Sequence, residues 1–259
     1  MTKKIFLFLM AAILSWPMAS AQPERVHYGV FNHLGLGFSF GTDGLGFDVA
    51  TPLTDYVGLR AGISFFPKLS YDTNIDIKDN NPHITPDVDI KATLNVFDFK
   101  VLADLYPFGK NSSFHLTGGV FMGKENFVTA TNTSMFIKDP SKYGKLGLML
   151  GDYRITTDKD GYVKADMTVN KMKPYVGLGF GRAVPKKNVN VSCDFGVMFW
   201  GEPRLGANTI DDWGNESYHR FKYSELDEYD DDDLKDFLKN AEKITVYPVL
   251  NIRINGRIF

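Results

Sequence analysis

Apolar side chains alternate with small or polar ones in eight stretches of this chain. In the stretch HLGLGFSF, for example, Leu36, Phe38 and Phe40 fall on one face of an extended chain, and glycine and serine fall on the other. A period of two residues is that of a β-strand, in which successive side chains point to opposite faces. The alternation therefore predicts strands with one apolar face. They cover residues 28–40, 45–51, 56–66, 90–106, 114–130, 163–182, 189–200 and 244–259.

The connections between these strands alternate between short and long. Three are short and carry Pro, Gly or Asn, as tight turns do, and three are long and polar. Outer-membrane barrels have brief periplasmic turns and large external loops. The expected fold class is therefore all-β, an eight-stranded antiparallel up-and-down transmembrane β-barrel with both termini in the periplasm. The short turns are residues 51–55, 107–112 and 183–188, the long loops are 67–89, 131–162 and 201–243, and residues 41–44 form a short turn on the long side.

Residues 1–21 have the organisation of a secretory signal peptide. Lys3 and Lys4 precede an apolar run, and a small-x-small cleavage site ends at Ala21. The run is shorter than the roughly 20 residues of a spanning helix, so a cleaved signal is favoured over a membrane anchor. We expect cleavage after Ala21, which leaves residues 22–259 as a single barrel domain.

A soluble, secreted barrel of the lipocalin type is the alternative fold. Such a barrel would turn the apolar face inward around a ligand, and alternation alone does not distinguish inside from outside. The signal peptide and the terminal aromatic residue, Phe259, favour the membrane barrel. The formal net charge of -2 argues against nucleic acid, which needs a strongly basic face. The single cysteine, Cys193, excludes an intrachain disulfide and has the parity of a small apolar side chain in its strand.

The face opposite the apolar one carries charges of both signs. Because unpaired buried charges are costly, we expect these side chains to pair within the lumen. An eight-stranded barrel is barely wide enough for its own side chains, which favours a salt-bridged plug over a selectivity lining for ions or small solutes. The expected lumen charge cluster is Asp48, Arg60, Asp98, Lys100, Asp104 and Asp194, with His115 and Thr117 on the same face.

Catalytic and metal-binding patterns are weak. Ser113 and His115 are two residues apart and could share a strand face, as in an outer-membrane lipid hydrolase, but nothing marks an oxyanion site. The five histidines are scattered, with no pair at metal-ligand spacing. The sequence GLGFG lacks the spacing of a nucleotide-binding loop, and glycine there suits the closure of a curved sheet. We expect no enzymatic activity, no metal and no cofactor.

An acidic segment before the last strand breaks the alternation. Residues 224–243 place apolar side chains at three- and four-residue steps, and the aspartates near the start and the lysines near the end suit a helix dipole. This predicts a short helix in the last external loop. Its aspartates match no calcium-loop spacing, so a solvated helix start is favoured over a divalent-cation site.

Four segments of the final third resemble a known family. They contain PYVGLGFG, DFGVMFWGEP, the acidic LDEYDDDDLKDF and YPVLNIRINGRIF. In this order they resemble the uncharacterised outer-membrane β-barrel proteins related to the OmpA-type transmembrane domain. The resemblance implies an eight-stranded outer-membrane barrel with a helical external insertion, and it supplies no catalytic residue. The segments are residues 174–181, 194–203, 226–237 and 247–259.

The last strand departs from the usual pattern at its end. Leu250, Ile252, Ile254 and Ile258 form its apolar row, and Phe259 has the opposite parity. Either a bulge shifts the end of the strand, or this residue does not face lipid.

The expected function is that of an integral outer-membrane barrel with a structural or surface-interaction role. A narrow pore for ions or small solutes is the first alternative, and a soluble lipocalin-like binder is the second. The expected partners are outer-membrane lipid, lipopolysaccharide and, through the C-terminal strand, the barrel-assembly machinery, with no nucleic acid.

Overall fold

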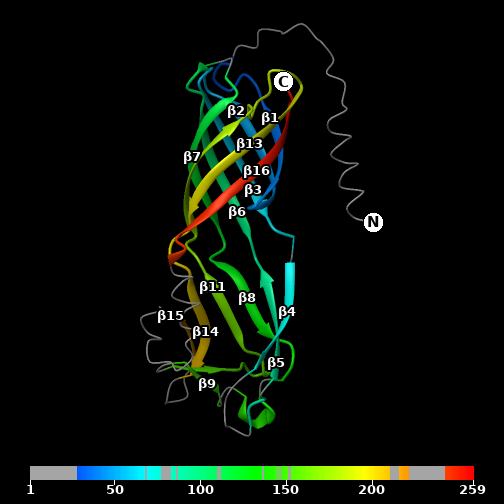
Figure 1. Cartoon of the computed structure of the whole chain (residues 1–259), viewed down its shortest axis with the longest axis vertical. Coiled ribbons are helices and arrows are strands. Elements are labelled where there is room, and N and C mark those ends of the chain that lie inside the picture. Colours follow the sequence, from blue (N-terminus) through cyan, green and yellow to red (C-terminus); the bar gives the residue numbers. More distant parts are fainter. Residues whose placement is uncertain are drawn as a thin grey trace, which may run out of the picture.

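The computed structural model describes residues 28–67, 69–76, 83–85, 87–109, 112–135, 137–143, 145, 147–150, 153–210, 216–221 and 243–259. Its strands form a closed barrel and a second sheet that extends from one end of the barrel (Figure 1). The barrel strands are β1 (Gly35–Gly41), β2 (Gly44–Pro52), β3 (Val57–Phe65), β6 (Phe97–Leu105), β7 (Phe114–Gly123), β12 (Met172–Phe180), β13 (Val189–Phe199) and β16 (Val246–Arg257).

The barrel has the expected up-and-down topology. Each barrel strand pairs antiparallel with the next barrel strand along the chain, and β16 closes on β1. The prediction of an eight-stranded antiparallel barrel is therefore confirmed for the described part of the chain. The first and last strands start and finish at one end of the barrel, which we call the terminal end, and the second sheet extends from the other, which we call the sheet end (Figure 1).

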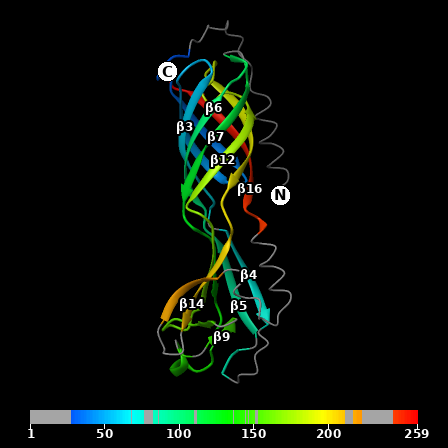
Figure 2. The same ribbon diagram turned by 90° about the vertical axis from the view of Figure 1, so that its left-hand side faces the viewer.

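The second sheet corrects the prediction of three long polar loops. Those loops and the far ends of the predicted strands form further strands at one end of the barrel (Figure 2). Their order in the sheet is β4-β5-β8-β11-β14-β10-β9, with β15 on β14. These are β4 (Leu69–Asp76), β5 (Asp87–Leu94), β8 (Asn126–Asn132), β9 (Gly147–Leu150), β10 (Tyr153–Thr156), β11 (Lys164–Thr168), β14 (Arg204–Ile210) and β15 (Glu216–Phe221).

Three predicted strands are thus split between the two sheets. Residues 90–106 become β5 and β6, residues 114–130 become β7 and β8, and residues 163–182 become β11 and β12. Alternation is present on both sides of each break, so the sequence predicts one long strand, although the apolar row changes phase between Val96 and Phe97. The pairing register shows the change: Asp98 lies opposite Gly123 in the barrel, whereas Leu94 lies opposite Val128 in the second sheet. The pairing of the two chain segments is therefore offset by one residue between the barrel and the second sheet.

The barrel turns its apolar face outward. Along β6 the exposed and buried side chains alternate without a break: Phe99 and Val101 are exposed, and Lys100 and Leu102 are buried. The other barrel strands except β3 also carry large exposed apolar side chains, which form an apolar exterior. They include Leu36, Phe38, Phe47, Leu116, Val176, Leu178, Phe195, Leu250, Ile252 and Ile254.

The end of β16 explains the phase of Phe259. The Ile258 N–H donates to the Leu34 carbonyl oxygen at 2.8 Å, and the Leu34 N–H donates to the Phe259 carbonyl oxygen at 3.2 Å. Two residues therefore lie opposite one, as in a β-bulge. Both Ile258 and Phe259 are exposed. Despite its opposite parity, the terminal aromatic side chain is therefore not buried in the lumen.

A stacked arginine closes the terminal end of the barrel. The Arg182 guanidinium lies 4.2 Å from the ring centre of Tyr106 and 4.8 Å from that of Tyr28. It also donates to the carbonyl oxygens of Ser112, Asp55 and Gly109 at 2.8–3.1 Å. Cation–π contacts and these charge-assisted hydrogen bonds fix the terminal-end turns to one another across the barrel opening.

Two sequence predictions concern residues outside the described part of the chain. The signal peptide at 1–21 lies entirely outside it, and so does the acidic helix at 224–243 apart from Lys243. Within the described residues, no helix has both the length and the apolar character that a membrane crossing requires.

Candidate functional site: the barrel lumen

The lumen begins at the sheet end with two buried ion pairs. Lys173 on β12 approaches Asp98 on β6 with an Nζ–Oδ1 distance of 2.6 Å. Lys100, two residues further along β6, lies 3.7 Å from Asp43 in the β1–β2 turn. All four side chains are buried. Each pair joins segments that are distant in sequence, so together they hold the barrel wall closed at the sheet end.

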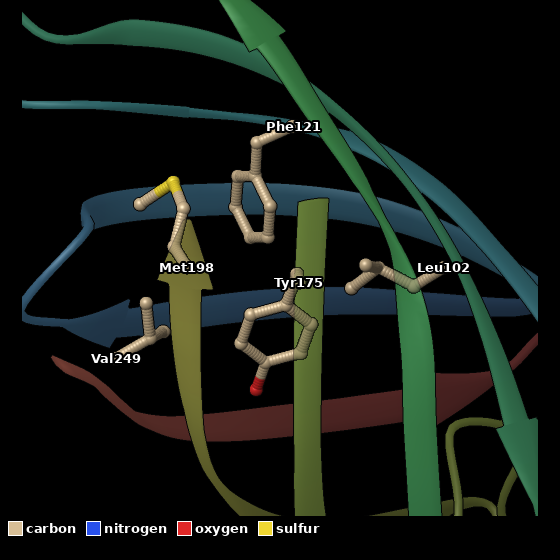
Figure 3. Packing of buried hydrophobic residues seen from close by; sticks show 5 residues of the cluster. All are labelled: Leu102, Phe121, Tyr175, Met198 and Val249. Atoms are coloured by element: carbon tan, nitrogen blue, oxygen red, sulfur yellow. The ribbon is translucent and has the colours of Figure 1, made fainter. Parts of the chain in front are cut away.

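An apolar layer follows these pairs along the lumen, toward the terminal end. Phe121 of β7 and Tyr175 of β12 pack with ring centres 5.4 Å apart, and Figure 3 shows both rings turned toward the interior. Side chains from three other strands complete the layer, and none of its members is more than 5% exposed. Such a layer has no polar lining for a hydrated ion to follow. Its members are Leu102, Phe121, Tyr175, Met198 and Val249.

A charged cluster fills the next part of the lumen. Arg60 on β3 donates to Asp104 on β6 at 2.7 Å and to Asp194 on β13 at 3.3 Å. The Thr117 hydroxyl of β7 donates to the same Asp104 oxygen at 2.8 Å, and His115 Nε2 lies 2.9 Å from Asp194. Side chains from four strands thus converge on one guanidinium and two carboxylates.

Arg253 of β16 provides the second cation of this cluster. Its guanidinium lies 3.5 Å from Asp48 on β2 and 3.7 Å from Asp194, and its Nε donates to the Ser192 hydroxyl at 3.2 Å. Its side chain is only 1% exposed. Arg253 therefore binds β16 to its neighbour β13 and also to β2, which lies beyond β1 in the barrel.

Small residues make room for these charges. A Cβ atom on Gly37 would lie 2.6 Å from Asp48 Oδ1, and one on Gly179 would lie 2.6 Å from His115 Nε2. Both distances are shorter than a real Cβ contact. The inward-facing glycines of the sequence therefore supply the volume that the buried carboxylates and the imidazole occupy, in addition to any effect on sheet curvature.

The six charged residues expected in the lumen all lie there, but in separate groups. Arg60, Asp104 and Asp194 are in direct contact, and Asp48 joins them through Arg253. Asp98 and Lys100 pair elsewhere, with Lys173 and Asp43.

Three partners were missing from the predicted set. Extending the parity of Gly177 and Gly179 back along their strand would have found Lys173, and the polar row of the last strand contains Arg253. No periodic signal marks Asp43, because it lies in a turn.

One cavity left between these side chains measures about 10 Å³, roughly the space of one water molecule. Its lining includes Ser39, Asp48, Lys100, Phe121 and Arg253. Side chains fill the lumen on both sides of it.

The hydrolase arrangement considered from the sequence does not form in the described residues. Ser113 is exposed before β7, whereas His115 is fully buried. His115 Nδ1 lies 3.4 Å from the backbone carbonyl oxygen of Ser113, and its Nε2 faces Asp194. Among the same residues, no group of three or more His, Cys, Asp and Glu side chains has the geometry of a metal site.

Comparison with known proteins gives likenesses of fold only. No family model and no curated protein matches the chain. CarO2 of Acinetobacter baumannii aligns over 87% of this chain and 98% of its own, with a TM-score of 0.47 and 17% identity. CarO of the same organism covers 86% and 96%, with a TM-score of 0.45 and 18% identity. A major outer membrane protein from Thermus thermophilus covers 87% and 98%, with a TM-score of 0.35 and 14% identity.

These likenesses are too distant to support statements about activity. The up-and-down order of the strands, the apolar exterior and the charged interior are features of this chain itself. By those features it is an eight-stranded β-barrel of the outer-membrane type, as the resemblance of its final third implied.

Proposed function

We propose that this protein is an integral outer-membrane barrel with a filled lumen, which carries a second β-sheet outside the membrane as a surface for interaction. The proposed role is structural or adhesive, without catalysis. One observation carries it: apart from the single apolar layer inside the lumen, the large apolar side chains of the barrel strands face outward, and the charged ones are buried within.

The apolar exterior supports a lipid environment. Val101, halfway along β6, is 48% exposed, and Phe99 beside it is 55% exposed. A soluble barrel of the lipocalin type would reverse this arrangement, since its apolar side chains surround the ligand. The barrel strands have 7 to 12 residues, which corresponds to the roughly 9–11 residues of a tilted transmembrane strand.

The filled lumen favours a structural role over the alternative of a narrow pore. Ion pairs, an apolar layer and a charged cluster follow one another along the lumen, and the cavity among them measures about 10 Å³. A hydrated ion is larger than this space. A pore would require several of these buried side chains to leave their partners together, and a buried charge without a partner is costly.

The proposal includes the route to the membrane. Removal of residues 1–21 in the periplasm would leave the mature chain, and β16 with its exposed terminal Phe259 would be presented to the barrel-assembly machinery. Outer-membrane lipid and lipopolysaccharide would surround the apolar exterior. No feature of the charged lumen calls for a cofactor.

Heat-dependent migration in gels tests the membrane assignment. The protein is expected in the outer-membrane fraction, soluble only with detergent, and its unboiled form should migrate differently from its boiled form because a closed barrel resists detergent. A soluble periplasmic protein serves as the control for fractionation. Recovery of the protein in the soluble periplasmic or culture fraction, with no shift on boiling, would overturn the proposal.

A further inference from the structure

A polar groove of about 340 Å³ lies on the second sheet, away from the barrel lumen. Its walls come from β5, β8 and the turn before β11. The side chains that line it are hydroxyls, an amide, one cation and one aromatic ring, among them Lys91, Thr93, Thr129, Thr131 and Tyr162. This composition differs from that of the apolar side chains on the opposite face of the same sheet, such as Ile90 and Val128.

The strand register places two lysines on either side of one threonine. Thr131 of β8 pairs with Lys91 of β5 on one side and with Lys164 of β11 on the other. Cross-strand partners project to the same face of a sheet, so this row presents cation, hydroxyl and cation in sequence. Asp72 of β4 follows Lys91 in register, so an acid lies at the far end of the row.

Several polar groups of the groove are available to a ligand. Within the described part of the chain, the Lys91 ammonium, the Thr131 hydroxyl and the Tyr162 hydroxyl have no hydrogen-bonding or ionic partner. Thr129, in contrast, donates to Asp166 at 2.7 Å and accepts from Asn95 at 3.1 Å. The groove thus combines free groups with neighbours that are held in place.

Tyr162 is presented by a rigid backbone. Asn132, buried below it, donates to the Gly161 carbonyl oxygen at 3.1 Å and accepts from the Val163 N–H at 2.6 Å. Asp158 accepts from the Tyr162 N–H at 2.8 Å through its carboxylate, and Gly161 adopts a φ of 85° in this turn. The backbone is therefore fixed on both sides of Tyr162, whose side chain is 47% exposed. An aromatic group ordered in advance loses little conformational entropy on binding.

We propose that this groove binds an oligosaccharide with an acidic substituent. The exposed tyrosine ring offers an apolar face for the C–H face of a sugar ring, and Thr131 can donate to and accept from sugar hydroxyls. The two lysines can bind a carboxylate or a phosphate. Carboxylates nearby, Asp72 and Asp89, accept from hydroxyls but repel a densely charged polyanion, so a sugar with few charges fits better than a nucleic acid strand.

This inference rests on the proposed function, because the groove reaches a glycan only if the second sheet lies outside the membrane. The acidic sugar could then belong to the phosphorylated core of lipopolysaccharide in the same membrane or to a uronate-containing glycan of another cell. Both present the same chemistry to the groove.

Calorimetric titration of the full-length protein in detergent micelles tests the proposal with defined probes. Tetragalacturonate and delipidated, phosphorylated core oligosaccharide are the acidic probes, and maltotetraose is the neutral one. At least one acidic probe is expected to bind saturably and more tightly than maltotetraose. Lys91→Met should lower that affinity roughly tenfold to a hundredfold, because it removes a hydrogen bond to a charged group. Tyr162→Ala should lower it about tenfold through the lost ring contact.

Matched variants on other surfaces serve as controls. Tyr71→Ala removes an exposed tyrosine from the opposite face of the same sheet, and Lys187→Met removes an exposed lysine at the terminal end of the barrel. Both should bind as the unaltered protein does. Which acidic probe binds identifies the source of the glycan. Binding of neither acidic probe, or binding that Lys91→Met and Tyr162→Ala leave unchanged, would overturn the inference.

The same preparations are run on gels with and without boiling. A heat shift together with absent binding refutes only the saccharide site. Absence of the heat shift in the unaltered protein refutes the membrane barrel itself.

Discussion

Replacement of Arg60 by methionine is expected to lower the free energy of unfolding by about 3–5 kcal/mol, the order of cost of leaving a buried charge without compensation. Arg60 is fully surrounded in the lumen and donates to Asp104 and Asp194. Asp194 keeps Arg253 and His115 as partners, whereas Asp104 keeps, among the described residues, only the Thr117 hydroxyl. Unfolding in guanidinium chloride, with the protein in phospholipid vesicles, measures the loss.

The double variant Arg60→Met with Asp104→Asn is the informative control. It removes the cation together with the carboxylate that depends on it, and removing both charges of a buried pair is often close to neutral. More than half of the lost stability should return. If Arg60→Met unfolds at the same denaturant concentration as the unaltered protein, the charged cluster does not contribute to the stability of the barrel in the way described.

Replacement of Val101 by arginine is expected to destabilise the folded barrel by about 2–4 kcal/mol in vesicles, the cost of a charged side chain at mid-depth on the lipid face of a barrel. Val101 is the central outward residue of β6 and pairs with Ala61 and Val120 on the neighbouring strands. The same unfolding measurement detects the loss.

The control for Val101→Arg is an arginine on the second sheet. Thr73 of β4 is exposed and lies outside the barrel, so Thr73→Arg should change stability by no more than about 0.5 kcal/mol. In a soluble protein both positions would be ordinary exposed sites. Equal and small effects of the two substitutions would therefore contradict the membrane location of the barrel.

Much of the barrel could be predicted from the sequence because its two faces differ so strongly. On β6, for example, Phe97, Phe99 and Val101 alternate with Asp98 and Lys100, and this repeat determines both the strand and its inward residues. Pairing in the lumen also followed from charge, since buried ions of both signs must meet. Which ions meet could not be predicted, because register and barrel shear decide that Asp98 pairs with Lys173 instead of Lys100.

The second sheet could not be separated from the barrel by alternation. Its strands have one apolar and one polar face too, so the alternation predicts IKATL, residues 90–94, as the start of a barrel strand and not as part of β5. The side chains of the saccharide groove carry no sequence signature, because Lys91, Thr131 and Tyr162 come from three separate segments. Asp43 could not be predicted as a lumen residue either, because it lies in a turn, where side chains do not alternate between two faces.

Conductance in planar lipid bilayers tests the central claim, a membrane barrel whose lumen is filled, most directly. The purified protein is inserted at known density, confirmed by its heat-dependent migration, and current is recorded under an applied voltage in potassium chloride. An open eight-stranded porin-like lumen would give steady current steps. The filled lumen predicts no current steps above the leak of the bare bilayer. It is filled by the ion pairs, the charged cluster around Arg60 and the apolar layer of Leu102, Phe121, Tyr175, Met198 and Val249. Reproducible, steady openings of the inserted protein would contradict the account.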